Sequence, residues 1–185
     1  NGFTVSEDQY YDSGLHVSNA YVNVNDWAYL YAEQTATSTT VNSSGSMVVS
    51  SGGCAMATTV NSGGSMRIDS GGSATSTTVN SRGYMWVSSG GCAMATTVNS
   101  GGSMGVGSGG SATSTTVNSG GNMTVYGNAI STTVNSGGSM RVDGIVASTT
   151  VNSGGNMTVY GNAISTTVHS GGEMTVCSGG SAIAT

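Results

Sequence analysis

Apolar and polar residues alternate along short segments of this chain, and the segments recur at a fixed period. The Val of a TTV triplet recurs every 19 residues and later every 17; a Met follows it by six residues, and a β-branched residue follows the Met by two. Within a segment such as Met66-Arg67-Ile68-Asp69, apolar and polar residues alternate, which is the pattern of a strand with one buried face. The three apolar columns, predicted to point inward, are Val41, Val60, Val79, Val98, Val117, Val134, Val151 and Val168; Met47, Met66, Met85, Met104, Met123, Met140, Met157 and Met174; and Val49, Ile68, Val87, Val106, Val125, Val142, Val159 and Val176.

Turn residues separate these segments. In most copies NSGG follows the strand that contains TTV, and SGG follows many of the Met-containing strands. Asn and Gly both favour the backbone conformations of tight turns. One unit therefore reads as a strand, a turn, a second strand and a second turn, too short for a helix. Stacked units predict an all-β fold, a right-handed parallel β-helix (a β-solenoid) of about nine 17–19-residue rungs, because parallel crossovers are right-handed.

The change of period from 19 to 17 supports strands. The segment DSGGSATSTTV of the longer unit becomes YGNAISTTV in the shorter one, so two residues leave one turn. Removing two residues keeps the inward and outward faces of the strands, whereas removing one would exchange them.

The two ends of the chain differ in regularity. Residues 1–38 fit the repeat poorly and are predicted to be degenerate N-terminal capping rungs, with Glu7, Asp8 and Asp12 on a solvated cap rather than in a calcium site. Residues 39–185 are predicted to form a single continuous solenoid, which we expect to be a piece of a longer protein.

Charge and composition exclude several classes of partner. Only 6% of the residues are charged, the net charge is -5, and Arg67, Arg82 and Arg141 are the three cations. We therefore expect no binding of nucleic acid or of anionic membranes, and no membrane insertion, because no apolar run has the length of a span. No cofactor or metal site is predicted, since His16 and His169 lie many rungs apart.

The three cysteines are predicted to be free thiols. Cys54 and Cys92 are two rungs apart, about 9–10 Å, and a disulfide needs Cα atoms within about 7 Å. Counting alternate residues back from the inward Val places both inside the solenoid. Cys177 is predicted to point outward without a partner.

Two other functions remain open as alternatives. A polysaccharide-acting β-helix enzyme would need clustered acids and bases, but Arg67 with Asp69 and Arg141 with Asp143 read as exposed ion pairs, so the chain is not predicted to be an enzyme. An ice-binding solenoid would use an outward Thr ladder, although its second rank here is Ser or Ala. The ladder consists of Thr40, Thr59, Thr78, Thr97, Thr116, Thr133, Thr150 and Thr167.

The TTVNSGG…V.SGG.A repeats resemble the passenger domains of self-associating autotransporter adhesins of Gram-negative bacteria, over roughly residues 36–185. The resemblance implies a β-helix on the outer surface of the cell that mediates autoaggregation, biofilm formation and attachment to an unknown host receptor. It also implies O-linked heptose, which a dedicated cytoplasmic heptosyltransferase adds to Ser or Thr.

Carried onto the matching turn positions, the resemblance implies thirteen glycosylation sites. They are Ser43, Ser51, Ser62, Ser70, Ser81, Ser89, Ser100, Ser108, Ser119, Ser136, Ser153, Ser170 and Ser178. Arg82 replaces the Gly that follows Ser81, which puts modification of Ser81 in doubt. Self-association is expected through a lateral face, on which Trp86, Tyr126 and Tyr160 are predicted to be the only large side chains.

Overall fold

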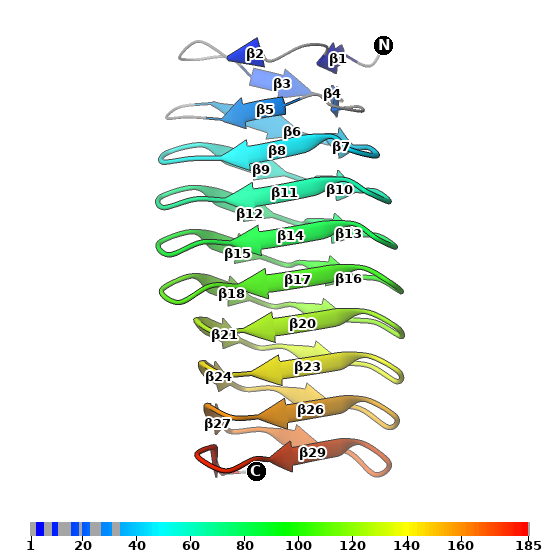
Figure 1. The fold of residues 1–185 in the computed structure, drawn as a ribbon, viewed down its shortest axis with the longest axis vertical. Helices are drawn as coiled ribbons and strands as arrows, with labels where there is room; N and C mark the ends of the chain where they lie inside the picture. Colours follow the sequence, from blue (N-terminus) through cyan, green and yellow to red (C-terminus); the bar gives the residue numbers. More distant parts are fainter. Residues whose placement is uncertain are drawn as a thin grey trace.

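The protein forms, in a computed structural model, a rod in which each turn of the chain adds one strand to each of three parallel sheets (Figure 1). The structure describes residues 3–5, 9–10, 16–18, 20–22, 27–30 and 34–184. Equivalent residues of successive repeats are paired, for example Thr59 with Thr78 and Met66 with Met85. The predicted all-β parallel solenoid is confirmed.

The strands of the three sheets follow one another in strict rotation along the chain. Sheet A contains β1 (Phe3–Val5), β4 (Ala20–Val22), β7 (Thr40–Val41), β10 (Thr59–Val60), β13 (Thr78–Val79), β16 (Thr97–Val98), β19 (Thr116–Val117), β22 (Thr133–Val134), β25 (Thr150–Val151) and β28 (Thr167–Val168). Sheet B contains β2 (Gln9–Tyr10), β5 (Trp27–Leu30), β8 (Ser46–Val49), β11 (Ser65–Ile68), β14 (Tyr84–Val87), β17 (Ser103–Val106), β20 (Asn122–Val125), β23 (Ser139–Val142), β26 (Asn156–Val159) and β29 (Glu173–Val176). Sheet C contains β3 (His16–Ser18), β6 (Thr35–Thr37), β9 (Cys54–Met56), β12 (Ser73–Thr75), β15 (Cys92–Met94), β18 (Ser111–Thr113), β21 (Asn128–Ile130), β24 (Ile145–Ala147), β27 (Asn162–Ile164) and β30 (Ser181–Ile183).

The number of rungs differs slightly from the prediction. Each sheet is 10-stranded, and the regular repeat starts at β7, whereas the sequence predicts about nine rungs. The strands β1 to β6 join the same sheets, and the boundary at residue 38 stays a prediction. Glu7, Asp8 and Asp12 lie outside the described residues.

The prediction of two strands per unit is wrong, because the segment before each TTV forms a third strand. A single residue with positive φ, such as Ser76 (φ 56) or Ala95 (φ 53), turns the chain from sheet C into sheet A. This corner breaks the alternation: Ala74, Thr77 and Val79 are the successive inward residues. If strict alternation is assumed through this corner, the inward and outward side chains of sheet C are therefore exchanged.

The interior consists of columns of identical residues. The Val, Met and β-branched columns predicted to point inward are 0–1% exposed up to Val159, and each such side chain contributes on the order of 1.5–3 kcal/mol through burial. In the last rung, where no further strand of the described chain packs below, Val168 and Val176 are exposed. The core is therefore shared between rungs and does not belong to any one of them.

Two polar columns also run along the rod. The amides of the Asn column form a ladder: Asn80 donates to the Oδ1 of Asn61 at 3.1 Å, and Asn99 donates to that of Asn80 at 2.9 Å. Beside it, the first Thr of each TTV is buried, with no hydrogen-bond partner for its Oγ1 among the described residues. The described residues contain no helix long and apolar enough to cross a membrane.

Candidate functional site: the serine turns and the outer faces

The turn between sheets A and B is a type II β-turn with Ser at its tip. In Asn61–Gly64, the N–H of Gly64 donates to the C=O of Asn61 at 2.9 Å, and Gly63 has a φ of 75°. A positive φ at the third position defines this turn type and favours Gly there. Ser62 therefore occupies the second position and is exposed.

The turn between sheets B and C repeats this geometry in the 19-residue rungs. The N–H of Gly72 donates to the C=O of Asp69 at 2.9 Å, and Gly71 has a φ of 74°. Ser70 is thus the structural equivalent of Ser62, and each long rung presents one Ser turn at each end of its sheet B strand.

All thirteen predicted acceptor serines lie in these turns, and all are exposed. None of their hydroxyls makes a hydrogen bond within the described chain. They comprise Ser43, Ser62, Ser81, Ser100, Ser119, Ser136, Ser153 and Ser170 in the first turn, and Ser51, Ser70, Ser89, Ser108 and Ser178 in the second. The structure therefore brings them together into two rows that run along the rod, one at each end of the sheet B strands.

Nine of the thirteen hydroxyls lie against a glycine of the following rung. A Cβ added at Gly90 would lie 2.6 Å from the Oγ of Ser70, and one at Gly101 would lie 2.8 Å from the Oγ of Ser81. Glycine therefore suits this position for two reasons: it adopts a positive φ without strain, and it leaves space for the hydroxyl.

Arg82 is an exception in the glycine row, with a φ of 57°. The N–H of Gly63 donates to its C=O at 3.1 Å, so Arg82 is stacked on the turn of Ser62. Ser81 itself lies against Gly101. The register therefore places Arg82 next to the turn of Ser62, as Gly101 lies next to Ser81, one rung earlier than the sequence order suggests.

The 17-residue rungs lack the second Ser turn. Tight corners formed by Tyr126-Gly127, Asp143-Gly144 and Tyr160-Gly161 replace it, and Figure 1 shows these loops as shorter from β20 to β27. A Cβ at Gly144 would lie 2.2 Å from the carbonyl oxygen of Gly127, so these corners have no room for any other residue.

The outer face of sheet B carries ion pairs, as predicted. Arg67 and Asp69 are 2.7 Å apart, and Arg141 donates two hydrogen bonds to Asp143, at 2.7 and 2.8 Å. The guanidinium of Arg141 also lies over the ring of Tyr160, 4.3 Å from its centroid. The hydrogen bonds to Asp143 raise the pKa of the Arg141 guanidinium above its usual range.

Aromatic rings lie between the two ion pairs. The rings of Tyr84 and Trp86 are stacked with centroids 6.4 Å apart, and Trp86 and Tyr126 are separated by the same distance in a tilted arrangement. Trp86 lies against the next strand because that strand has glycines: a Cβ at Gly105 would lie 2.3 Å from its ring. Partial burial, and then the proximity of Tyr126, raise the pKa of the Tyr84 phenol.

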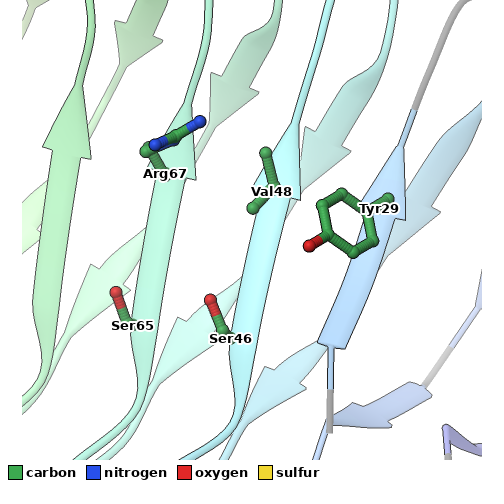
Figure 2. A pocket seen from close by; sticks show the side chains of 5 residues that line it. All are labelled: Tyr29, Ser46, Val48, Ser65 and Arg67. Atoms are coloured by element: carbon green, nitrogen blue, oxygen red, sulfur yellow. The ribbon is translucent and has the colours of Figure 1, made fainter. Parts of the chain in front are cut away.

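A shallow hollow of roughly 360 Å³ opens on the same face. Figure 2 shows Tyr29, Val48 and Arg67 in one row across three neighbouring strands, with Ser46 and Ser65 in a second row. An aromatic ring, a guanidinium and two hydroxyls thus surround an apolar floor.

The outer face of sheet C carries exposed Met and Ile side chains between Thr, Ser, Asn and Cys residues, which sequence reasoning missed. Aligned and neighbouring columns expose Met56, Met94, Ile130, Ile145 and Ile164 by 39–46%. The expectation that the three aromatic residues are the only large outward side chains is therefore wrong. The positive-φ corner hid this stripe, because it reverses the face to which these positions point.

The same reversal corrects the placement of two cysteines. Cys54 and Cys92 are free, as predicted, but they are half-buried on the outer side of sheet C, where Ala55 and Ala93 point inward. Cys177 is likewise free and half-buried.

The remaining candidate sites are dispersed. The predicted Thr ladder points outward from sheet A but is half-buried as far as Thr150, and the Ser or Ala before it sits at the positive-φ corner. His16 begins β3 and the exposed His169 follows β28. The described residues contain no group of three His, Cys, Asp or Glu that could hold a metal ion.

Comparison with known proteins gives two matches. Residues 60–102 match the family model described as "Adhesin of bacterial autotransporter system, probable stalk". The whole fold is similar to the crystal structure of a hyper-glycosylated TibA fragment whose glycosylation was catalysed by TibC, with 35% sequence identity, a TM-score of 0.58, and coverage of 98% of this chain and 86% of that one. A comparison with curated proteins gave no match.

Proposed function

The chain belongs to the autotransporter adhesins as a passenger domain at the cell surface, and we propose that its Ser turns are acceptors for O-linked heptose. In this proposal the glycosylated rod is anchored to the outer membrane through parts of the protein beyond this segment. It mediates autoaggregation, biofilm formation and attachment to a host receptor, and it binds its targets without transforming them.

The observation that carries the proposal is the presentation of the turn serines. Each hydroxyl sits at the second position of a type II turn, is exposed, and makes no hydrogen bond within the described chain. The neighbouring glycines have no side chains that would obstruct the approach of a transferase.

Stacking also gives the transferase the same target many times. Successive Ser turns are about 4.8 Å apart, and the strand–turn–strand around each is nearly identical from Ser43 to Ser153. A heptosyltransferase that accepts one such turn could therefore modify an edge rung by rung. The glycosylated relative shows that a solenoid similar to this one can carry many sugars.

Self-association is proposed through sheet C, with a second copy of this chain on another cell as the partner. The exposed side chains of Met56, Met94, Ile130 and Ile164 recur at every second rung of one column, with Thr or Ala between them, so two rods can match their stripes over several rungs. Burying such a stripe removes apolar surface from water on both copies.

Co-expression with a heptosyltransferase of the relative's kind tests the acceptor proposal. We expect intact mass spectrometry to show a ladder of added heptose units, and peptide mapping to place them on turn Ser residues. Modification restricted to the strand Thr residues, with the turns bare, would contradict the proposal. Changing Ser100 and Ser119 to Ala should remove two units and leave the fold intact, whereas the matched change of Thr97 and Thr116 to Val, which deletes their hydroxyls, should remove none.

A further inference from the structure

We propose that the outer face of sheet B is a binding site for an extended, uncharged carbohydrate chain. This site is separate from the acceptor turns, and it needs no sugar attached to the protein itself. The ligand would be a neutral polysaccharide, or the glycan of a host or bacterial surface, lying along the rod axis.

The first support is the shape of the aromatic surface. Tyr84, Trp86 and Tyr126 form one continuous set of rings, with two centroid separations of 6.4 Å. Tyr84 and Tyr126 are exposed by 41% and 48%. The C–H groups of a pyranose ring pack against such rings, and the phenol and indole edges offer hydrogen-bonding groups to its hydroxyls.

Glycine makes this surface possible at one particular rung. Gly105 takes the position that Arg67 and Trp86 hold in the two preceding strands, and any Cβ there would collide with the indole. The sequence thus keeps Trp86 low against the sheet, which leaves a shallow surface accessible to a flexible polymer.

The second support is the arrangement of polar groups along the face. Tyr126 and Tyr160 occupy the same column two rungs apart, about 9–10 Å, near the length of two sugar rings in an extended chain. Asp143 lies between them, paired with Arg141. The ion pairs Arg67–Asp69 and Arg141–Asp143 each provide hydrogen-bond donors and acceptors without net charge. Such pairs suit sugar hydroxyls better than the carboxylates or sulfates of an anionic polysaccharide.

The hollow between Tyr29 and Arg67 extends the same face toward the N-terminus (Figure 2). Arg67 pairs in register with Trp86, so the hollow and the aromatic surface are continuous. Its ring, guanidinium and two serine hydroxyls repeat the combination of stacking and hydrogen-bonding groups that is found further along.

A second copy of the chain fits this face less well. The aliphatic stripe that suits a protein partner lies on sheet C, whereas sheet B offers rings with polar edges, two ion pairs and an open hollow. We therefore assign the two faces to different partners.

The test uses the full chain expressed without any transferase, so that its outcome is independent of the acceptor proposal. Cellohexaose, chitohexaose and mannohexaose serve as neutral probes, and a heparin hexasaccharide serves as the anionic probe. Titration calorimetry should detect weak binding of at least one neutral probe and no preference for heparin.

Paired variants then locate the site. Trp86→Ala combined with Tyr126→Ala should weaken that binding by about tenfold, the effect of losing roughly 1.4 kcal/mol. Met94→Ala with Ile130→Ala, on sheet C of the corresponding rungs, should leave it unchanged. Tyr126→Ala alone provides a milder variant should the double variant unfold at a lower temperature.

Several results would overturn the assignment. These are no binding of any neutral hexasaccharide, binding of heparin alone, or equal sugar binding by the sheet B and sheet C variants. Loss of self-association in the sheet B variant, with sugar binding intact, would instead identify this face as a contact between copies.

Discussion

The 19-residue rungs and the 17-residue rungs have the same interior but different edges. Both bury Val, Met and a β-branched residue in the same columns, as Val79 and Met85 do in a long rung and Val134 and Met140 do in a short one. The long rung presents two Ser turns, and the short rung replaces the second by a two-residue corner. The interior thus sets the register of the stack, while a turn can change length without disturbing it.

This difference separates structural from functional constraints along one chain. In two of the three short corners, Tyr126 and Tyr160 are exposed in the column that Asp69 and Ser88 occupy in long rungs, one residue before the Ser of the second turn. The short rungs therefore lack one row of acceptor serines, and they expose more aromatic surface at the same end of the sheet B strands. The two halves of the rod are expected to present different chemistry to the same surroundings.

The largest effect should come from the interior, and it should be equal in both halves. Met85→Ala and Met140→Ala each remove a side chain that is 0–1% exposed, and each should lower the free energy of unfolding by about 2–5 kcal/mol. Denaturant titration of the two variants measures this. Losses that differ by more than the experimental error would show that the two kinds of rung are packed differently.

The next effect tests whether turn length is independent of the core. Deleting both Ser108 and Gly109 should give a short rung beside the existing short rungs, with a change in unfolding free energy of less than about 1 kcal/mol. Deleting Gly109 alone leaves an intermediate length that neither turn geometry accommodates, and it should cost more than about 2 kcal/mol. Equal stability of the two deletion variants would mean that this turn imposes no register.

The Asn ladder should contribute less, and again equally in both halves. Asn99→Ala removes two amide hydrogen bonds, each 2.9 Å long, and should cost about 1–2 kcal/mol. Ser100→Ala, at the next residue, removes no hydrogen bond and should cost less than about 0.5 kcal/mol. Thermal unfolding of the two variants compares them directly; equal melting temperatures would show that the ladder adds nothing.

The sequence predicts the stack because its period and alternation are visible without coordinates. Val60, Met66 and Ile68 point inward as expected, and Ser62 and Ser70 lie in turns as expected. The third strand is invisible to the same reasoning, because Ala57 or Ser76 can adopt a positive φ without any Gly to signal it.

That hidden corner accounts for the errors on the candidate faces. If side chains are assumed to alternate strictly across Ala57, Cys54 is placed inside the solenoid and Met56 is not recognised as an exposed residue. The contact between a Ser and the glycine of the following rung cannot be recognised from the linear sequence either, since the partners are 18 or 20 residues apart. Only register reveals which hydroxyl Arg82 affects.

Substitution of Arg82 should have the smallest effect on stability, but it should change how much sugar a neighbouring serine carries. By the register of the stack, Arg82 stands in the glycine row next to the turn of Ser62, a row in which every other regular rung except that of Ser44 has a glycine. During co-expression with the heptosyltransferase, Ser62 should carry less sugar than Ser100, while Ser81, which lies against Gly101, should be modified as fully as Ser100. Arg82→Gly should raise the occupancy of Ser62 at least about twofold and change the unfolding free energy by less than about 0.5 kcal/mol. Gly101→Arg is the matched converse and should lower the occupancy of Ser81. Site-resolved mass spectrometry measures the sugar occupancy of Ser62 and Ser81 separately. If Arg82→Gly changes the occupancy of Ser81 and leaves that of Ser62 unchanged, an acceptor is controlled by its own turn and not by the rung stacked against it.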